Sequence, residues 1–265
     1  MKNTSYRTAV ILCGGRGTRL GSLSKKMPKS LVKIQNYPIL WFILNILKKN
    51  NFNHFILPIG YKGEQIKRFI KKKFPLEKNI QIVNTGINTS IALRILKIKK
   101  HIKSDNFLLL NGDAIFDFDL DKIYKNHINK KAIMTFISFG VMANFGTVGV
   151  KKGKVVDFRR NMTFDFVKSQ HKKNLTSYVY SGISMMNKIA ISMNFKNFEN
   201  FEKKLYPKII KKFKCNVEIP RGFWHSIDNV KDIKVGNSRN SEGSKYFQIS
   251  KIIKMINKLK KKTND

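Results

Sequence analysis

The chain alternates short, continuous apolar runs with stretches in which apolar residues recur every three or four positions. Short apolar runs are typical of buried strands, and the wider spacing is typical of helices that bury one face. The first half predicts strands at Thr8–Cys13, Phe55–Ile59, Ile80–Asn84 and Phe107–Leu110, and helices at Ile39–Lys49, Lys62–Phe74 and Thr89–Ile102. This alternation predicts an α/β fold: a Rossmann-like mixed, mostly parallel sheet with helices on both faces.

The second half is less regular. Its patterns predict strands at Ala132–Phe139 and Tyr178–Met186, a helix at Phe198–Phe213 with a break at Pro207, and a hairpin in "GTVGVKKGKVVDF". The hairpin should turn at Lys152-Gly153, because a short loop with glycine between two apolar runs favours a tight turn. The polar stretch Ser238–Lys245 is expected to be a linker.

Beyond that linker, five apolar residues share one helical face: Ile249, Ile252, Ile253, Ile256 and Leu259. Lysines cover much of the remaining surface, so the segment is a basic amphipathic helix. Such a helix docks on its own domain or on a second copy in a homo-oligomer. The alternative is contact with an anionic membrane surface. We therefore divide the chain into a main domain at 1–237 and a basic amphipathic C-terminal segment at 238–265.

Composition narrows the class of protein. With 265 residues and 42% hydrophobic residues the chain can form a packed core, and it has no apolar run long enough to span a membrane. The N-terminus lacks the pattern of a secretory signal. Cys13 and Cys215 are far apart and make no metal-binding signature. We expect a cytoplasmic protein in which Cys13 serves packing.

The formal charge of +37 is compatible with a polyanionic partner. The lysines are scattered over the whole chain, however, and no recognisable nucleic-acid motif accompanies them. We therefore read the charge as mainly compositional and expect no specific nucleic-acid partner. A strongly positive field would still raise the encounter rate with anionic small molecules, an effect that salt weakens.

A glycine loop follows the first predicted strand in "ILCGGRGTRL". Gly14, Gly15 and Gly17 allow a sharp turn that brings backbone N–H groups against phosphate oxygens. Arg19 adds a planar fork suited to phosphate, and Pro28 stiffens the backbone before Lys29. The alternative is a plain tight turn with surface arginines. The buried strand before the loop and the Pro-Lys pair after it favour phosphate binding.

Two carboxylates are candidates for metal binding. Asp113 follows the predicted strand that ends in "NGD", at the sheet edge that also carries the glycine loop, where it is well placed to hold Mg²⁺. Asp228 lies in "FWHSIDNVKD" before a predicted helix, so helix capping is its alternative role. Two carboxylates and several cations around one phosphate suffice for metal-assisted nucleotidyl or phosphoryl transfer.

These motifs resemble those of the sugar-1-phosphate nucleotidylyltransferases. The likeness begins with "GGRGTRL" and "PKSLVKI", continues through "NGDAIFDFDL" and "YSGISMMN", and covers about residues 8–235. "NTGINTSIALR" looks like the D-T-G-x-x-T-x-T-G-G-R element of glucose-1-phosphate cytidylyltransferases, and "GFWHSIDNVKD" is similar to their closing F-W-x-x-x-D segment. The resemblance implies a fold of the nucleotide-diphospho-sugar transferase type.

The resemblance also implies a reaction and its residues. The nucleotidyl group of an NTP, in the first place CTP, is transferred to a sugar 1-phosphate, which yields an NDP-sugar and pyrophosphate with Mg²⁺ as cofactor. Arg19 and Lys29 are the implied catalytic residues, and Asp113 and Asp228 the implied metal ligands. The nucleotide would be bound by Leu12, Gly14, Gly15, Arg16, Gly17, Thr18, Thr85, Thr89 and Asp113. The sugar phosphate would be bound by Arg94, Arg160, Ser181 and Gly182.

Two elements depart from the family pattern. The T-G-G of the cytidylyltransferase element reads Ile91-Ala92-Leu93, and the usual F-x-E-K-P reads Phe158 to Met162, where Arg159 or Arg160 stands in for the lysine. Both changes concern substrate binding rather than the phosphate loop. Two alternatives therefore stay open: a guanylyltransferase for a heptose or mannose 1-phosphate, and a non-catalytic homologue that binds sugar nucleotides.

Overall fold

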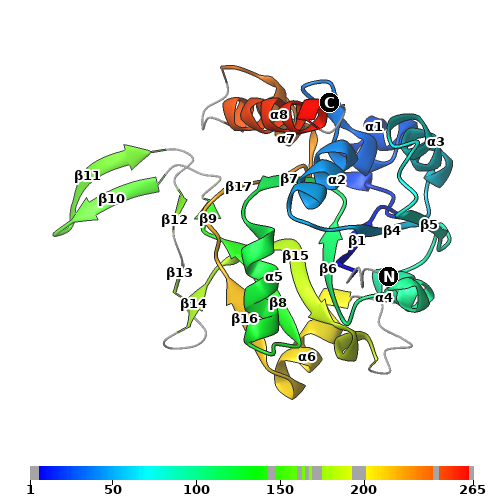
Figure 1. Ribbon diagram of the computed structural model, residues 1–265. Coiled ribbons are helices and arrows are strands. Elements are labelled where there is room, and N and C mark those ends of the chain that lie inside the picture. Colours follow the sequence, from blue (N-terminus) through cyan, green and yellow to red (C-terminus); the bar gives the residue numbers. More distant parts are fainter. Residues whose placement is uncertain are drawn as a thin grey trace.

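A seven-stranded sheet runs through the molecule in the computed structural model (Figure 1), which describes residues 6–142, 147–159, 163–164, 167–168, 175–192, 201–240 and 245–262. The strands lie in the order β16-β8-β15-β6-β1-β4-β5. Their bounds are β1 Thr8–Leu12, β4 His54–Ile59, β5 Ile80–Asn84, β6 Asn106–Asn111, β8 Met134–Phe139, β15 Val179–Asn187 and β16 Cys215–Glu218.

Most neighbours in this sheet are parallel. β1 pairs in parallel with β4 and β6, β4 with β5, and β16 with β8, whereas β15 runs antiparallel to both β6 and β8. The mixed, mostly parallel sheet expected from the sequence is therefore confirmed. Its parallel strands end at one edge, which brings the loops after β1, β4, β5 and β6 together.

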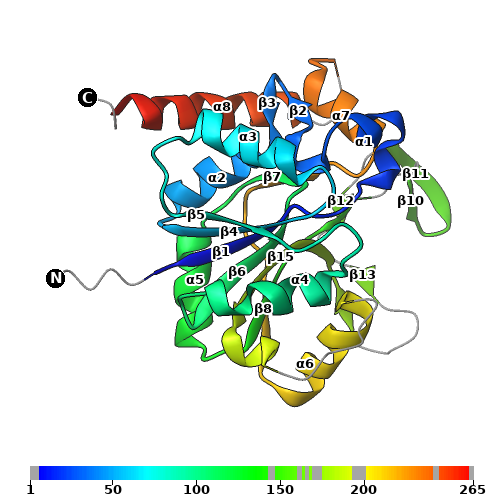
Figure 2. The same cartoon turned by 90° about the vertical axis from the view of Figure 1, so that its right-hand side faces the viewer.

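The sheet is buried on both faces. In β1, Ala9 and Ile11 belong to one hydrophobic core and Val10 to another, because successive side chains of a strand point to opposite faces. The first core includes α2 (Ile39–Lys49), α3 (Gly63–Lys73) and α5 (Leu120–Asn129), and the second includes α4 (Ile91–Ile98) and α6 (Tyr206–Lys212). Figure 2 shows α2 and α3 above the sheet and α4 and α6 below it.

Smaller elements complete the fold. The remaining helices are α1 Ser22–Lys26, α7 Val230–Asn237 and α8 Lys245–Lys262, with a π-helical turn at Phe201–Leu205 before α6. Short two-stranded sheets are formed by β2 Lys33–Ile34 with β3 Tyr37–Pro38, β7 Ala114–Asp117 with β17 Phe223–Ser226, β9 Val141–Met142 with β12 Thr163–Phe164, β10 Thr147–Lys151 with β11 Lys154–Arg159, and β13 Val167–Lys168 with β14 Thr176–Ser177. Short 3-10 turns lie at Thr18–Leu20, Lys29–Leu31, Lys99–His101 and Lys188–Ile191.

The hairpin expected in the second half is β10–β11, which stands away from the main body (Figure 1). Its turn residues Lys152 and Gly153 both have positive φ, at 48° and 77°, as a type I′ hairpin turn requires. Helix bounds differ slightly from expectation elsewhere. α4 begins at Ile91 rather than Thr89, because the Ser90 side chain accepts a hydrogen bond from the Leu93 N–H and caps the helix.

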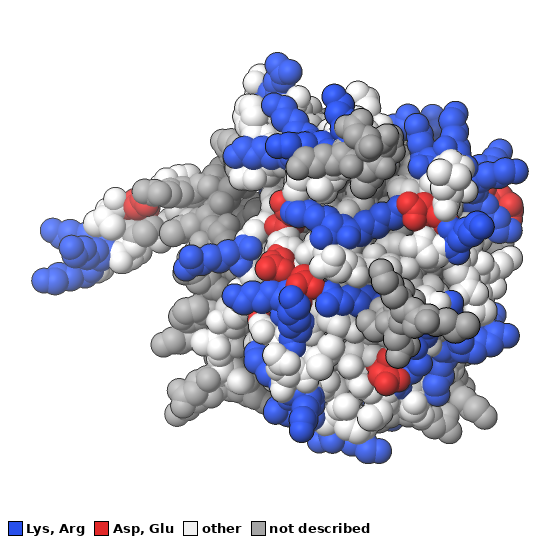
Figure 3. Space-filling view, in the orientation of Figure 1, with Lys and Arg blue, Asp and Glu red and all other residues white. Residues whose placement is uncertain are grey.

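The C-terminal helix α8 packs on the main domain. Ile249, Ile252 and Ile256 are buried in the first core, and the helix contacts α2 and α7. Leu259, at the end of the apolar face, stays 41% exposed. Within the described residues, no helix combines the length and apolar character needed to cross a membrane. Basic side chains are spread over the face in Figure 3 rather than gathered in one stripe.

Candidate active site

The glycine loop connects β1 to the short 3-10 turn at Thr18–Leu20. Gly17 has φ of 62°, in the left-handed region that favours glycine. A Cβ on Gly17 would lie 3.2 Å from the Cβ of Lys29, so the loop backbone passes close to that lysine. Glycine thus serves both the turn and the close approach.

The backbone N–H groups of this loop are available to a ligand. In the part of the chain that the structure describes, the N–H groups of residues 15 to 18 have no hydrogen-bond acceptor. Gly15 and Thr18 are exposed and line the cavity described below. Unpaired N–H groups next to a glycine turn are suited to bind an anion.

Lys29 lies between two carboxylates. Its Nζ is 2.8 Å from Asp113 Oδ2 and 3.0 Å from Asp228 Oδ1. Pro28 holds the extended backbone that precedes the 3-10 turn beginning at Lys29. The exposed Arg19 reaches the same group, with its Nη1 3.8 Å from Asp228 Oδ1. Residues from three distant parts of the sequence therefore form one ionic cluster.

Local structure places the two carboxylates. The Gly112 N–H donates to the Leu12 carbonyl over 3.1 Å, and a Cβ on Gly112 would lie 2.8 Å from that oxygen, so glycine lets β6 lie close to the glycine loop. Asp113 is the next residue in the chain and is therefore placed beside the glycine loop.

Asp228 was a candidate helix cap, but Asn229 caps α7 instead. Asp232 completes the capping box and also accepts from the Asp228 N–H. The Asp228 carboxylate is left to bind Lys29 and to accept from Ser226 Oγ at 2.8 Å. The alternative that Asp228 caps the helix is therefore wrong, and its position is compatible with the predicted role as a metal ligand.

Electrostatic interactions within the cluster keep both Lys29 and Asp228 ionised. Burial lowers the pKa of the Lys29 ammonium, but Asp113 and Asp228 outweigh burial and the pKa is raised. Burial raises the pKa of Asp228, but Lys29 outweighs it and the pKa is lowered. Near neutral pH Lys29 is therefore a charged donor and Asp228 an ionised acceptor. Cys13, close by, has its pKa raised to about 12 by burial, in line with a packing role.

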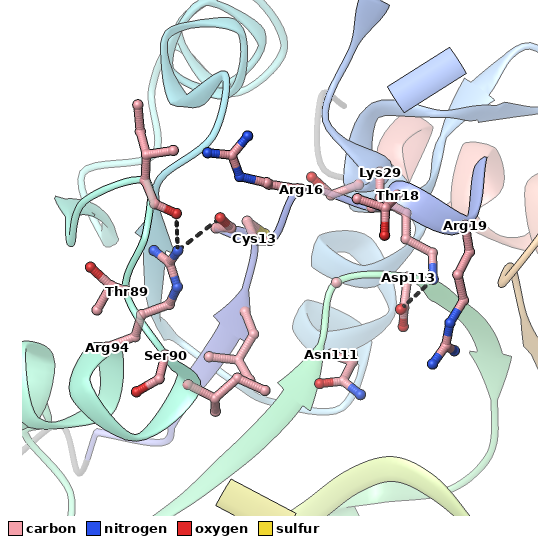
Figure 4. A pocket seen from close by; sticks show the side chains of 18 of the residues that line it. Cys13, Arg16, Thr18, Arg19, Lys29, Thr89, Ser90, Arg94, Asn111 and Asp113 are labelled. Atoms are coloured by element: carbon pink, nitrogen blue, oxygen red, sulfur yellow. Dashed lines mark hydrogen bonds and ion pairs between the residues drawn. The ribbon is translucent and has the colours of Figure 1, made fainter. Parts of the chain in front are cut away.

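A cavity of about 910 Å³ opens between these groups (Figure 4). It is lined by most of the residues expected from the sequence: Leu12, Gly14, Gly15, Arg16, Gly17, Thr18, Arg19, Lys29, Thr89, Arg94, Asp113 and Asp228. Four lining side chains are cationic and three are carboxylates. The cavity is large enough and charged enough to take a phosphorylated ligand.

Three expected residues do not line this cavity. Thr85 is fully buried, and its Oγ1 donates to the Ile59 carbonyl at 2.8 Å. Ser181 is buried and donates to the Ile137 carbonyl at 2.7 Å, within a bulge of β15. Gly182 has φ of 77°, and a Cβ there would lie 2.6 Å from Asn111 Nδ2. Thr85, Ser181 and Gly182 are therefore absent from the cavity lining. Arg160 lies outside the described residues.

Arg94 also departs from expectation. It was expected to bind the sugar phosphate, but only 4% of it is exposed and its guanidinium donates to backbone carbonyls. One of these is the carbonyl of Gly14 in the glycine loop, at 2.9 Å. All four Nη–H groups of Arg94 are bound in this network, which leaves only its Nε–H for a ligand.

The cavity contains residues that the sequence did not reveal. Asn88 accepts from Arg16 Nη2 at 2.8 Å, which links the loop after β5 to the glycine loop. Asn111 is the last residue of β6 and the first residue of the "NGD" motif, and this position at the end of a strand is the signal that could have identified it. Glu202 reaches the cavity from the π-helical turn before α6. Its segment looked like an ordinary helix, and no sequence signal marked it.

The donor set fits a single divalent cation shared with a ligand. No cluster of three or more His, Cys, Asp or Glu side chains occurs among the described residues. Two carboxylates nevertheless converge on one cation, the Lys29 ammonium. Mg²⁺ in phosphate-binding sites typically takes one or two carboxylates and completes its shell with phosphate oxygens and waters. Asp113 and Asp228 therefore fit Mg²⁺ bound together with a phosphorylated substrate.

Comparison with known proteins adds an independent finding. The family model described as Nucleotidyl transferase matches residues 8–239. A protein named as a probable glucose-1-phosphate cytidylyltransferase, from Bacillus subtilis, is 29% identical over 261 residues, 91% of this chain and 99% of that protein. The D-glycero-alpha-D-manno-heptose 1-phosphate guanylyltransferase of Campylobacter jejuni is 29% identical over 233 residues, 83% of this chain and 99% of that enzyme.

A solved structure has the same architecture. HddC from Yersinia pseudotuberculosis has a TM-score of 0.65 and 21% identity, with 86% of this chain and 96% of that chain covered. At this identity the likeness concerns the fold. It confirms the fold type that the sequence motifs implied.

Proposed function

The chain belongs to the nucleotidyl transferase family, and on this premise we propose that it transfers the nucleotidyl group of an NTP to a sugar 1-phosphate and releases pyrophosphate. The observation that carries the proposal is the Lys29 ammonium, held between Asp113 and Asp228 beside a loop of unpaired N–H groups. Cations, carboxylates and amide donors converge there on one cavity, which matches the needs of a polyphosphate substrate.

Each group has a distinct task in this reaction. The loop N–H groups of residues 15 to 18 bind phosphate oxygens, and Arg19, 80% exposed at the side chain, stabilises the leaving pyrophosphate. Lys29 is protonated and donates to the α-phosphate, where negative charge grows as the sugar phosphate oxygen attacks in line. The new P–O bond forms as the bond to pyrophosphate breaks. No general base is needed, because a sugar phosphate is already ionised near pH 7.

Mg²⁺ is the cofactor that we propose, held by Asp113 and Asp228. Bound there, it would neutralise part of the triphosphate charge. Lys29 then turns from the two carboxylates to the phosphate. Positioning and charge neutralisation supply most of the rate enhancement in such a site.

The sugar phosphate is proposed to bind on the α6 side of the cavity, where Glu202 is located. Glu202 has no hydrogen-bond or ion-pair partner among the described residues. Partial burial, and then the Asp113 charge, raise its pKa. Sugar hydroxyls are neutral donors that can satisfy such a carboxylate without adding charge.

CTP is the proposed nucleotide, on the basis of the "NTGINTSIALR" element and the relative in Bacillus subtilis. GTP is the second candidate, because the guanylyltransferase of Campylobacter jejuni is equally similar at 29% identity. Pyrophosphate release from each of the four NTPs, tested against hexose and heptose 1-phosphates, separates them. Turnover with CTP supports the first candidate and turnover with GTP the second, while release with UTP or dTTP alone rejects both.

A further inference from the structure

Arg94 joins three loops beneath the cavity. Its Nη2 donates to the Gly14 carbonyl at 2.9 Å and to the Ile87 carbonyl at 3.3 Å, and its Nη1 donates to the Ile59 carbonyl at 3.2 Å and to Thr85 Oγ1. Gly14 follows β1, Thr85 and Ile87 follow β5, and Ile59 is the last residue of β4. One planar guanidinium thus holds together three strand ends at the edge of the sheet where the cavity opens.

Glycines leave the space that this side chain fills. A Cβ on Gly14 would overlap the Arg94 guanidinium, and a Cβ on Gly60 would lie 2.7 Å from Nη1. Gly14 therefore has a second role besides turning the loop. It lets a buried arginine approach the loop from below.

The bond to the Gly14 carbonyl also orients a donor. In a planar trans peptide the C=O of one residue and the N–H of the next point in opposite directions. The Gly14 carbonyl accepts from the buried Arg94 and, over the longer distance of 3.3 Å, from the Tyr61 N–H, so the Gly15 N–H points to the other side. There Gly15 is exposed and lines the cavity, and in the described chain its N–H has no acceptor.

The charge of Arg94 is not neutralised by a carboxylate. No ion pair of Arg94 occurs among the described residues, and its four acceptors are neutral oxygens. Burial lowers its pKa, but an arginine remains protonated at neutral pH. A buried positive charge directly beneath the glycine loop adds to the attraction that the loop exerts on an anion.

We infer that Arg94 is a positioning residue for the NTP phosphates, which acts by fixing the Gly14–Gly15 peptide and by its buried charge, and that it does not contact the sugar phosphate. The inference rests on the proposed function. It assigns Arg94 to the nucleotide half of the site, whereas the family resemblance assigned it to the sugar phosphate.

The test compares Arg94→Lys with wild type and with the matched control Arg68→Lys, an exposed arginine on α3. Lysine keeps a charge but loses the planar fork. We expect the dissociation constant of the NTP, measured by calorimetry without sugar phosphate, and the KM for the NTP to rise about tenfold or more in Arg94→Lys. The KM for the sugar 1-phosphate should stay within about twofold of wild type, as both constants should in Arg68→Lys.

Thr85→Val provides a milder second variant, because it removes one acceptor of Arg94 and keeps the arginine. It should weaken NTP binding in the same direction by a smaller factor. The inference is overturned if NTP affinity is unchanged in both variants, or if the KM for the sugar 1-phosphate rises as much as that for the NTP. Wild-type protein that binds no NTP and releases no pyrophosphate would instead refute the proposed function itself.

Discussion

The Lys29 ammonium lies 2.8 Å from Asp113 Oδ2, although 84 positions separate the two residues in the sequence. The same ammonium binds Asp228, so one protein cation occupies the oxygens that we assign to Mg²⁺. With Mg²⁺ at the proposed site, Lys29 and the metal ion would compete for these oxygens until a phosphate offers the lysine another partner.

Replacement of Lys29 by methionine should abolish most activity and yet tighten metal binding. Without the ammonium, Asp113 and Asp228 lose the cation that they share, and an added divalent cation can take its place between the two negative charges. We expect the affinity for Mn²⁺ in the absence of nucleotide to rise about tenfold or more over wild type. Manganese electron paramagnetic resonance or calorimetry measures this directly.

Lys33→Met is the matched control, since Lys33 is a nearby exposed lysine. It should bind Mn²⁺ like wild type. Equal or weaker Mn²⁺ binding by Lys29→Met would show that Asp113 and Asp228 do not form the metal site.

Asp113→Asn tests one carboxylate by itself. The amide keeps the shape but loses the charge, so we expect kcat to fall about 100-fold or more, with higher Mg²⁺ concentrations recovering part of the loss. Asp117→Asn, four positions on and paired with Lys49, should retain wild-type kcat. Wild-type turnover by Asp113→Asn would remove this residue from the mechanism.

The glycine loop and its cations were predictable because their chemistry is local in sequence. Gly14 to Arg19 follow a buried strand directly, and Pro28-Lys29 comes soon after. Asp113 was predictable as well, because a residue that follows a parallel strand must lie at the edge of the sheet where ligands bind. The meeting of Lys29 with Asp228 was beyond such reasoning, since it depends on how β17 and β7 pair across the domain.

Substitution of Glu202 tests the proposal that the sugar phosphate binds on the α6 side of the cavity. We expect Glu202→Gln to raise the KM for the sugar 1-phosphate about tenfold and to leave the KM for the NTP nearly unchanged, because an amide accepts fewer hydrogen bonds from hydroxyls than a carboxylate. Steady-state kinetics with each substrate varied in turn measures both constants. Glu64→Gln on α3 is the control. A selective rise in the KM for the NTP would move Glu202 to the nucleotide side.

The sequence could not separate side chains that are free to bind a ligand from side chains whose polar atoms are already bound within the protein. Thr85, Ser181 and Arg94 were all expected at substrates, and all three are buried with their polar atoms bonded to backbone carbonyls. A motif match marks a position as belonging to the site. Whether its side chain is free to contact a ligand depends on packing and backbone geometry, for which one sequence gives no signal.

Part of the loss of folding stability at low pH should come from His127. This residue is fully buried between Thr135 and Asn106, and burial lowers its pKa from 6.5 to about 4. The unfolded chain binds the proton below about pH 6.5 while the folded state does not, so stability present above that pH is lost as pH falls toward 4. The contribution at stake is roughly 3 kcal/mol.

Urea unfolding of wild type and His127→Gln at pH 7, 5.5 and 4.5 measures this effect. The variant should be less stable at pH 7, because glutamine fits the site less well, and should lose less stability on acidification. Parallel pH dependences in the two proteins would assign the acid sensitivity elsewhere, with His225, whose pKa burial also lowers to about 4, as the next residue to test.

One measurement decides whether this cavity performs nucleotidyl transfer: phosphorus NMR of the wild-type protein with Mg²⁺, an NTP and a mixture of hexose and heptose 1-phosphates. We expect equal amounts of pyrophosphate and an NDP-sugar to appear with CTP or GTP, and neither product to form at a comparable rate with Asp113→Asn. No NDP-sugar from any of the four NTPs, or equal rates in wild type and Asp113→Asn, would contradict the proposed function of the Lys29 cluster.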